Sequence, residues 1–225
     1  ISKEHLGINF ENFKLANIMS LLNPDAALAR GKLSGQFAVE DPYTSPGMVL
    51  DLNIKDFEVL DTNMGVLTAQ GNSISNSGYD FQMAIKEGVA DLDLKGNYTA
   101  NETAAQIDLN LDINRFDVAA LEKLSFGELS NADGTISGAM KLAGTTAEPR
   151  YEGAFQFDNA KFEVTKLNAT FLLKNEELSL NNEGVTFNNF RVEDENANPI
   201  VVNGTIGTES FVNPTFDLDL KATNF

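Results

Sequence analysis

Few residues in this sequence have the types and spacing that catalysis or metal binding needs. His5, the only histidine, lies among the first residues, and for lack of partners around it we expect neither a Ser-His-Asp triad nor a metal site built on histidine; cysteine is absent. The acidic run Glu193-Asp194-Glu195 offers oxygen ligands suited to Ca²⁺, but no calcium-loop pattern surrounds it. We interpret this run as a solvated turn. The sequence therefore predicts a non-enzymatic protein without a cofactor or a bound metal.

Two other patterns have structural explanations. The aspartates at 91 and 93, and those at 217 and 219, alternate with leucine, as on the outer face of a sheet, so we assign them no glycosidase role. The pairs Gly31/Gly35 and Gly134/Gly138 lack the Gly-Lys-Ser/Thr of a phosphate loop and the long apolar segment of a membrane helix pair. Close backbone packing in a bent strand explains these glycines better.

The charge of the chain excludes some partners. Asp and Glu number 33 against 16 Lys and Arg, for a net charge of -17. Binding to a phosphate backbone requires a basic surface that displaces counterions, so nucleic acid is not expected as a partner. No apolar run approaches the roughly 18–20 residues that span a bilayer.

Alternation with period two dominates the chain and predicts a mainly β protein with many strands about 10–14 residues apart. Each run has one apolar face and one face of Asp, Asn, Gln or Lys. The apolar positions of these runs are our candidates for an inner, ligand-binding row: Leu50, Leu52, Ile54, Phe81, Met83, Ile85, Leu92, Leu94, Ile107, Leu109, Leu111, Ile113, Phe155 and Phe157. Short amphipathic helices are predicted near 15–29 and 118–126, the first interrupted at Asn23-Pro24.

The sequence repeats with a period of about 105 residues, so that residues 57–59 (FEV) fall on residues 162–164 (FEV). We expect a first unit at 1–107, a second at 108–215 and the start of a third at 216–225, in one continuous structure that is a fragment of a longer array.

A slip in the alternation recurs with this repeat. Two polar residues separate the apolar positions in the segments 10–13 (FENF), 54–57 (IKDF), 113–116 (INRF) and 222–225 (ATNF), and 159–162 (NAKF) is a weaker relative. Such a slip moves every later side chain to the other face unless a β-bulge absorbs a residue. The alternative is that the strand ends there and the chain turns. Recurrent bends would curl a long antiparallel sheet into a trough with its apolar face inside.

With the repeat laid out, the chain resembles the periplasmic repeat region of the TamB (translocation and assembly module) family, within the wider AsmA-like group. The stretch 111–164 carries the resemblance: a strand, a short helix, Gly-Thr-Ile-Ser-Gly at 134–138, and a Gly-Thr…Glu-Pro…Gly turn at 144–153 before a Phe-rich strand. The first unit matches less well, because 39–47 (VEDPYTSPG) replaces that turn. The resemblance covers nearly the whole chain through loose structural motifs.

The resemblance implies a protein anchored in the inner membrane by a segment outside this sequence. Its periplasmic β-sheet would curl into a "taco" with an apolar groove for phospholipid acyl chains, serving lipid transport to the outer membrane and outer-membrane assembly. An outer-membrane barrel assembly protein is the implied partner, through regions outside this chain.

Two alternatives remain open from the sequence. The apolar rows could close on one another as a dry β-sandwich core. The exposed strand edges could instead pair with outer-membrane strands, so that the chain acts as a structural, chaperone-like scaffold.

Overall fold

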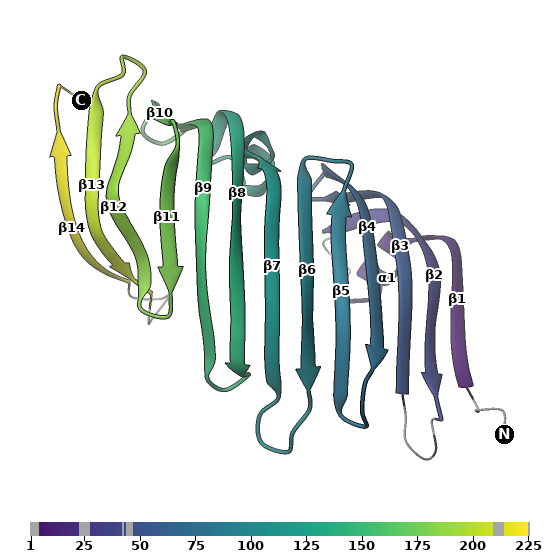
Figure 1. Cartoon of the computed structure of the whole chain (residues 1–225). Coiled ribbons are helices and arrows are strands. Elements are labelled where there is room, and N and C mark those ends of the chain that lie inside the picture. Colours follow the sequence, from purple (N-terminus) through teal and green to yellow (C-terminus); the bar gives the residue numbers. More distant parts are fainter. Residues whose placement is uncertain (1–4, 23–27, 42, 44–46, 209–213, 225) are drawn as a thin grey trace. The chain divides into compact units, whose positions relative to one another are not determined.

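The computed structural model describes residues 5–22, 28–41, 43, 47–208 and 214–224. It confirms the mainly β class: the strands form one 14-stranded antiparallel sheet (Figure 1). Strands β1 to β10 follow one another in chain order, β12, β13 and β14 come next, and β11 pairs with both β9 and β12. The curl of the sheet and the sequence repeat stay predictions.

Contacts divide the chain into two compact units, which are described separately. Unit 1 comprises Ile1–Leu111 and Leu142–Pro149, and unit 2 comprises Asp112–Lys141 and Arg150–Phe225. The elements wholly in unit 1 are β1 (His5–Lys14), α1 (Leu15–Leu22), β2 (Ala29–Glu40), β3 (Gly47–Val59), β4 (Thr62–Ser73), β5 (Gly78–Lys86) and β6 (Ala90–Thr99).

Three strands contribute residues to both units: β7 (Gln106–Asp117), β8 (Leu129–Thr145) and β9 (Pro149–Val164). The remaining elements belong to unit 2: a 3-10 helix, η1 (Val118–Ala120), then α2 (Leu121–Leu124), β10 (Ala169–Leu173), β11 (Glu176–Asn181), β12 (Gly184–Glu193), β13 (Pro199–Gly207) and β14 (Thr215–Ala222).

Both predicted helices exist but are shorter than expected. α1 ends at Leu22, and Ala29, predicted to be helical, begins β2. The predicted break at Asn23-Pro24 lies outside the described residues. The second helix is reduced to η1 and α2, and Ser125 and Phe126 form a turn in which Ser125 Oγ accepts from Leu129 N at 3.0 Å. At Ala29 the pairing of β2 with β3 overrides the apolar spacing that suggested a longer helix.

Two of the sequence slips become β-bulges, and in both the residue before the phenylalanine is Asn or Asp. Register shifts occur between Phe10 and Phe13 and between Ile54 and Phe57, with Asn12 at φ 49° and Asp56 at φ 52°. Asn and Asp tolerate this left-handed conformation better than other residues with a side chain. At the first bulge, the backbone amide of Asn12 finds a hydrogen-bond acceptor on the neighbouring strand β2: Asn12 N donates to Ser34 Oγ at 3.1 Å.

The other slips behave differently. At 113–116 the residue before the phenylalanine is Arg115, which has no positive φ, and β7 continues to Asp117. In β9 the left-handed residue is Asn159, where the pairing of the strand passes from β11 to β10. β14 ends at Ala222, before Asn224 at φ 53°, and Phe225 lies outside the described residues.

A further bulge was not predicted. The register of β12 shifts between Phe187 and Phe190, with Asn189 at φ 50° and its amide donating to Asn203 Oδ1 at 2.7 Å. The signal was present in the sequence, because Phe-Asn-Asn-Phe repeats the spacing of 10–13.

The bulges of unit 1 lie in a row across its strands. Leu33 pairs with both Phe13 and Ile54, which flank the bulges of β1 and β3, and Phe57 pairs with Gly65 of β4. We call this end of the strands the bulge end of unit 1. The opposite end, where β2 connects to β3, β4 to β5 and β6 to β7, is its turn end.

Unit 2 has a core of its own, formed where its bulged strands meet the short helices. The buried cluster comprises Val118, Ala132, Ala160, Leu173 and Phe190, with Phe157 and other partly buried residues packed against it. Val118 of η1 is only 1% exposed, so this helix covers the apolar side of the sheet there. Glu122 Oε1 holds α2 to β8 by accepting from Ala132 N at 2.6 Å.

Candidate functional site

The strands of unit 1 present one apolar face and one polar face. Residues directly opposite each other in neighbouring strands share a face. One such row on the apolar face runs through Phe37, Leu50, Gly71, Phe81 and Gly96 of β2 to β6. A Cβ built on Gly96 would lie 2.6 Å from Leu109 Cδ2, so the Leu109 side chain covers Gly96 and extends the row onto β7.

Most of the predicted inner residues belong to this face. The structure brings together eleven of them in unit 1: Leu50, Leu52, Ile54, Phe81, Met83, Ile85, Leu92, Leu94, Ile107, Leu109 and Leu111. Ile113, Phe155 and Phe157 fall in unit 2, where Phe155 pairs with Leu178 and Phe157 packs on the buried cluster. Ile54 is buried, at 8% exposed, and all the other predicted residues are partly buried.

Burial of the apolar face differs between the two ends of unit 1. At the bulge end, Leu33, Ile54, Phe57 and Met64 are all less than a tenth exposed, and α1 packs on β2 there. Toward the turn end, no residue of the row through Phe37 and Phe81 is a buried large side chain, and Tyr98 is 37% exposed. The apolar face is therefore covered at one end and accessible at the other.

The accessible part contains a groove of about 550 Å³. We call it the turn-end groove; the residues that line it come from β2, β3, β5 and β6: Phe37, Val39, Gly47, Met48, Tyr79, Phe81 and Tyr98. The rings of Tyr79 and Tyr98 form a tilted pair with centroids 6.3 Å apart. Between the walls lies β4, which places the small residue Gly71 opposite both Leu50 and Phe81.

Sequence reasoning identified only Phe81 among the groove residues. Phe37 and Val39 are two residues apart, as are Tyr79 and Phe81, and Tyr98 lies between Asn97 and Thr99, so period two could have found them. They were missed because the candidate row followed the strand centres, whereas the groove lies at the strand ends.

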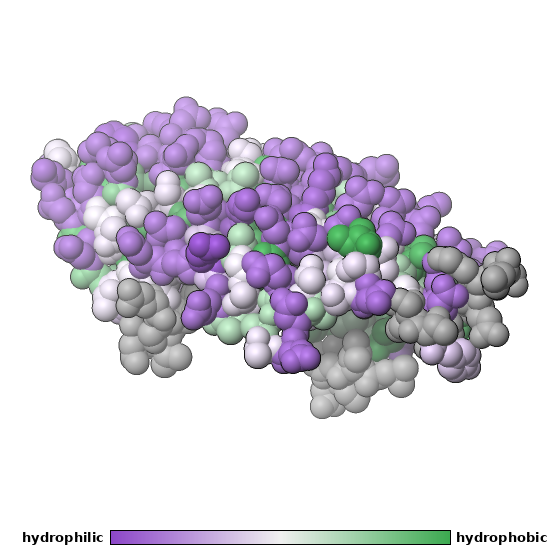
Figure 2. Space-filling view, turned by 60° about the horizontal axis from the view of Figure 1, so that its bottom comes forward, coloured by the Kyte–Doolittle hydropathy of each residue, from purple (hydrophilic) through white to green (hydrophobic). Residues whose placement is uncertain are grey.

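The polar face of unit 1 carries a second depression, of about 560 Å³. Its side chains hydrogen-bond to one another across the strands: Gln82 Nε2 donates to Gln70 Oε1 at 2.5 Å, and Gln70 Nε2 donates to Asp51 Oδ1 at 3.4 Å. Because these polar side chains hydrogen-bond to one another and are exposed, we interpret them as a solvated outer face. In the view of Figure 2, hydrophilic residues cover most of the visible surface, with small apolar patches between them.

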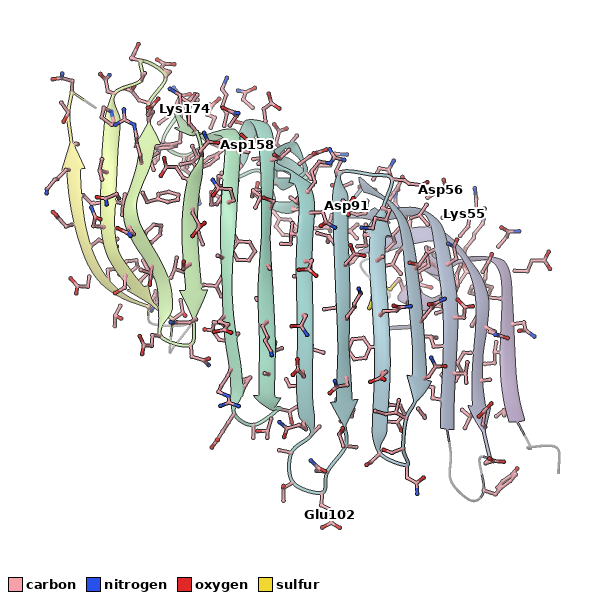
Figure 3. All side chains as sticks on the ribbon, in the orientation of Figure 1. Lys55, Asp56, Asp91, Glu102, Asp158 and Lys174 are labelled. Atoms are coloured by element: carbon pink, nitrogen blue, oxygen red, sulfur yellow. The ribbon has the colours of Figure 1, made fainter. Side chains whose placement is uncertain are left out.

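Most of the described cations of unit 1 lie at the bulge end. Lys32 Nζ lies 2.7 Å from Asp56 Oδ2, and Arg30 Nη1 lies 2.6 Å from Asp61 Oδ1. The hydrogen bond and charge of Lys32 lower the pKa of Asp56 below its ordinary value. Figure 3 shows Lys55, Asp56 and Asp91 at this end of the strands and Glu102 in the loop at the turn end.

Unit 2 contains a carboxylate that is buried and paired. The Glu193 side chain is 8% exposed, with Oε2 2.7 Å from Lys174 Nζ and Oε1 2.8 Å from Arg191 Nε. These two partners, Lys174 first, lower the pKa of Glu193 from its ordinary value of 4.5 despite the opposing effect of desolvation. The group stabilises the ionised, folded form and does not lie in any groove described above.

The lowered pKa of Glu193 predicts a pH dependence of stability. Because the unfolded chain binds the proton more readily, the stabilisation is complete above pH 4.5 and is lost as the pH falls through the lower pKa of the folded state. Glu193→Gln should therefore weaken the fall in the free energy of unfolding below pH 4.5, measured by urea titration at several pH values. The exposed Glu195→Gln is the control; an equal change in both variants would refute the assignment.

Comparisons of the sequence and structure with protein-family models, curated proteins and solved structures found no match. Within the described residues, no helix is long and apolar enough to cross a membrane. In the same part of the chain, no group of three His, Cys, Asp or Glu side chains is placed to hold a metal ion. The assignment to the TamB family stays a prediction.

Proposed function

We propose that this chain is a non-enzymatic lipid-binding segment whose apolar sheet face holds phospholipid acyl chains. In keeping with the TamB resemblance, it serves lipid transport to the outer membrane and outer-membrane assembly. It works in the periplasm, as part of a protein anchored in the inner membrane by another segment. The observation that carries the proposal is the turn-end groove: an accessible apolar hollow between Phe37 and Met48 on one side and Phe81 and Tyr98 on the other.

Two physical points support an acyl chain as the occupant. Each methylene moved from water into an apolar site contributes roughly 0.8 kcal/mol, so a long acyl chain gains far more than a small polar ligand. The apolar row from Phe37 to Leu109 is only partly buried, whereas a closed sandwich core would bury its large side chains nearly completely.

Photocrosslinking in intact bacteria tests the proposal. A photoreactive amino acid at Tyr98, in the groove wall, should form adducts with phospholipid, because this side chain faces the proposed acyl chain. The matched control is the neighbouring Asn97, whose side chain points to the opposite face of β6 and should give no lipid adduct. Lipid at both positions would indicate nonspecific association with membranes, and no lipid at Tyr98 would refute the groove as a lipid site.

A second function, strand-edge scaffolding, is favoured by exposed apolar residues on β1 and β14. Leu6 and Ile8 of β1 are 68% and 54% exposed, and Phe216 and Leu220 of β14 are 67% and 60% exposed. Both strands are at the edges of the described sheet, where unpaired backbone groups can accept another strand. Protein adducts at Ile8 or Phe216, combined with no lipid at Tyr98, would favour this function.

A further inference from the structure

Strand β4 lies between the two walls of the turn-end groove (Figure 1). We propose that β4 is the floor of the acyl site and that Gly71 and Leu67 set its depth: the acyl tail enters at the turn end, runs lengthwise above β4 and stops at Leu67. This inference rests on the proposed function and adds to it a limit on the length of acyl chain that the site accepts.

The floor is low because β4 carries small residues between large ones. Ser73, Gly71 and Ala69 are two residues apart, so they point to one face of β4. Their span along the strand is about 14 Å, at roughly 3.4 Å per residue. Large side chains of β3 and β5 stand directly opposite two of these small residues: Leu50 and Phe81 on either side of Gly71, and Leu52 and Met83 on either side of Ala69. The accessible groove therefore continues along the strand as a depression with raised walls.

The depression ends where β4 enters the bulge end. Leu67, the next residue of this face, pairs with Ile54 and Ile85, so three large side chains stand side by side there. Ile54 is 8% exposed, and Leu33, which pairs with Ile54 from β2, is 3% exposed. A tail that reached this row would have to displace packed side chains, which close-packed protein interiors resist. The row of Leu67 is therefore the stop of the site.

The backbone does not require a glycine at position 71. The φ of Gly71 lies outside the left-handed range, whereas Gly65 of the same strand has φ 98°. A Cβ built on Gly71 would make ordinary contacts, 3.5 Å from Asp80 O and 3.7 Å from the Cβ atoms of Leu50 and Phe81. Glycine inside a strand weakens it and often marks a close approach by a ligand. The missing side chain keeps the middle of the floor open for the tail.

Titration calorimetry on the full chain measures the depth with lysophospholipids that share a phosphocholine headgroup and differ only in acyl length, each below its micelle concentration. Affinity should rise about fourfold with each added methylene while the tail lies above the floor, and should then level off. The length at which the affinity levels off is the depth of the site. An affinity that rises up to the longest soluble lysolipid would overturn the inference while leaving acyl-chain binding intact.

Gly71→Leu is the decisive variant, because its side chain fills the floor from a position where a Cβ has room. The affinity should level off at shorter acyl lengths, with the affinity for the shortest lysolipids unchanged. Leu67→Ala should move this length in the opposite direction, because it opens the row that stops the tail. Thr68→Leu is the matched control: it places the same side chain on the exposed, opposite face of β4 and should leave the length unchanged.

Urea denaturation checks that each variant is folded, and the Gly71→Leu result decides the inference if Leu67→Ala is too unstable to measure. An equal loss of affinity at every acyl length in Gly71→Leu, no change in that variant, or the same shift in Thr68→Leu would each overturn the role of β4 as the floor. Failure of the wild-type chain to bind a lysolipid of any length would instead refute the proposed function itself.

Discussion

Replacing Gly65 by alanine is expected to lower the free energy of unfolding by about 2–5 kcal/mol, because two costs add. Gly65 has φ 98°, a conformation that residues with a Cβ rarely adopt. The new methyl group would also lie 2.0 Å from the backbone atom Lys86 O, at the end of β5, and 2.6 Å from the backbone atom Gly88 N, in the connection from β5 to β6. Backbone cannot move away as a flexible side chain can, so the pairing of β4 with this connection should break.

Gly127 provides the matched control for this experiment. Its φ is 88°, close to that of Gly65, but a Cβ built there meets no atom within 4 Å. Gly127→Ala should therefore lose only the conformational share, about 1–2 kcal/mol. Urea denaturation followed by far-ultraviolet circular dichroism measures both variants. Equal losses would show that the close approach of the β5–β6 connection to Gly65 contributes nothing.

Truncation of Phe190 to alanine is the second change with a large expected effect, a loss of about 3–5 kcal/mol from the cavity it creates. Phe190 is 6% exposed and is the largest member of the buried cluster of unit 2. Its ring forms edge-to-face pairs with Phe157 and Phe187, with ring centroids 6.0 Å and 5.3 Å away. Such pairs stabilise the fold beyond the burial of the rings alone.

The control for Phe190 is the same substitution at Phe216, which is 67% exposed on β14. An exposed position of this kind should change the free energy of unfolding by less than about 0.5 kcal/mol. The two variants are compared by thermal and urea denaturation. A loss at Phe190 no greater than that at Phe216 would mean that the cluster does not stabilise unit 2.

The sequence predicts the class of this fold because the period of two has one physical cause. Phe81, Met83 and Ile85 alternate with polar residues since one face of β5 is apolar and the other is solvated. The slips were also visible, but their outcome depended on a single residue: Asp56 adopts the left-handed conformation, whereas Arg115 at the corresponding position does not. An Asn or Asp directly before a phenylalanine is common to the three bulges at Asn12, Asp56 and Asn189, so the same sequence feature could have identified the last of them.

The candidate site was less predictable. The apolar row of unit 1 follows from alternation, but alternation does not say where along a strand the row becomes accessible. That depends on α1 packing on β2 and on the buried residues of the bulge end, both of which require the tertiary pairing of strands. Met48 and Tyr98 are ordinary alternating residues in the sequence and become groove residues only because nothing buries them fully at the turn end.

The row of bulges also bears on how a sheet with many similar strands avoids mispairing during folding. Alternating strands can pair out of register at little cost, because a shift of two residues restores the same faces. A bulge removes that freedom: a shifted partner would meet the left-handed Asn189 or Asn12 without the matching acceptor, Asn203 Oδ1 or Ser34 Oγ. Each of these bulges and its acceptor therefore favour one neighbouring strand in one register. The asparagines at the bulges thus also favour the correct pairing of strands during folding.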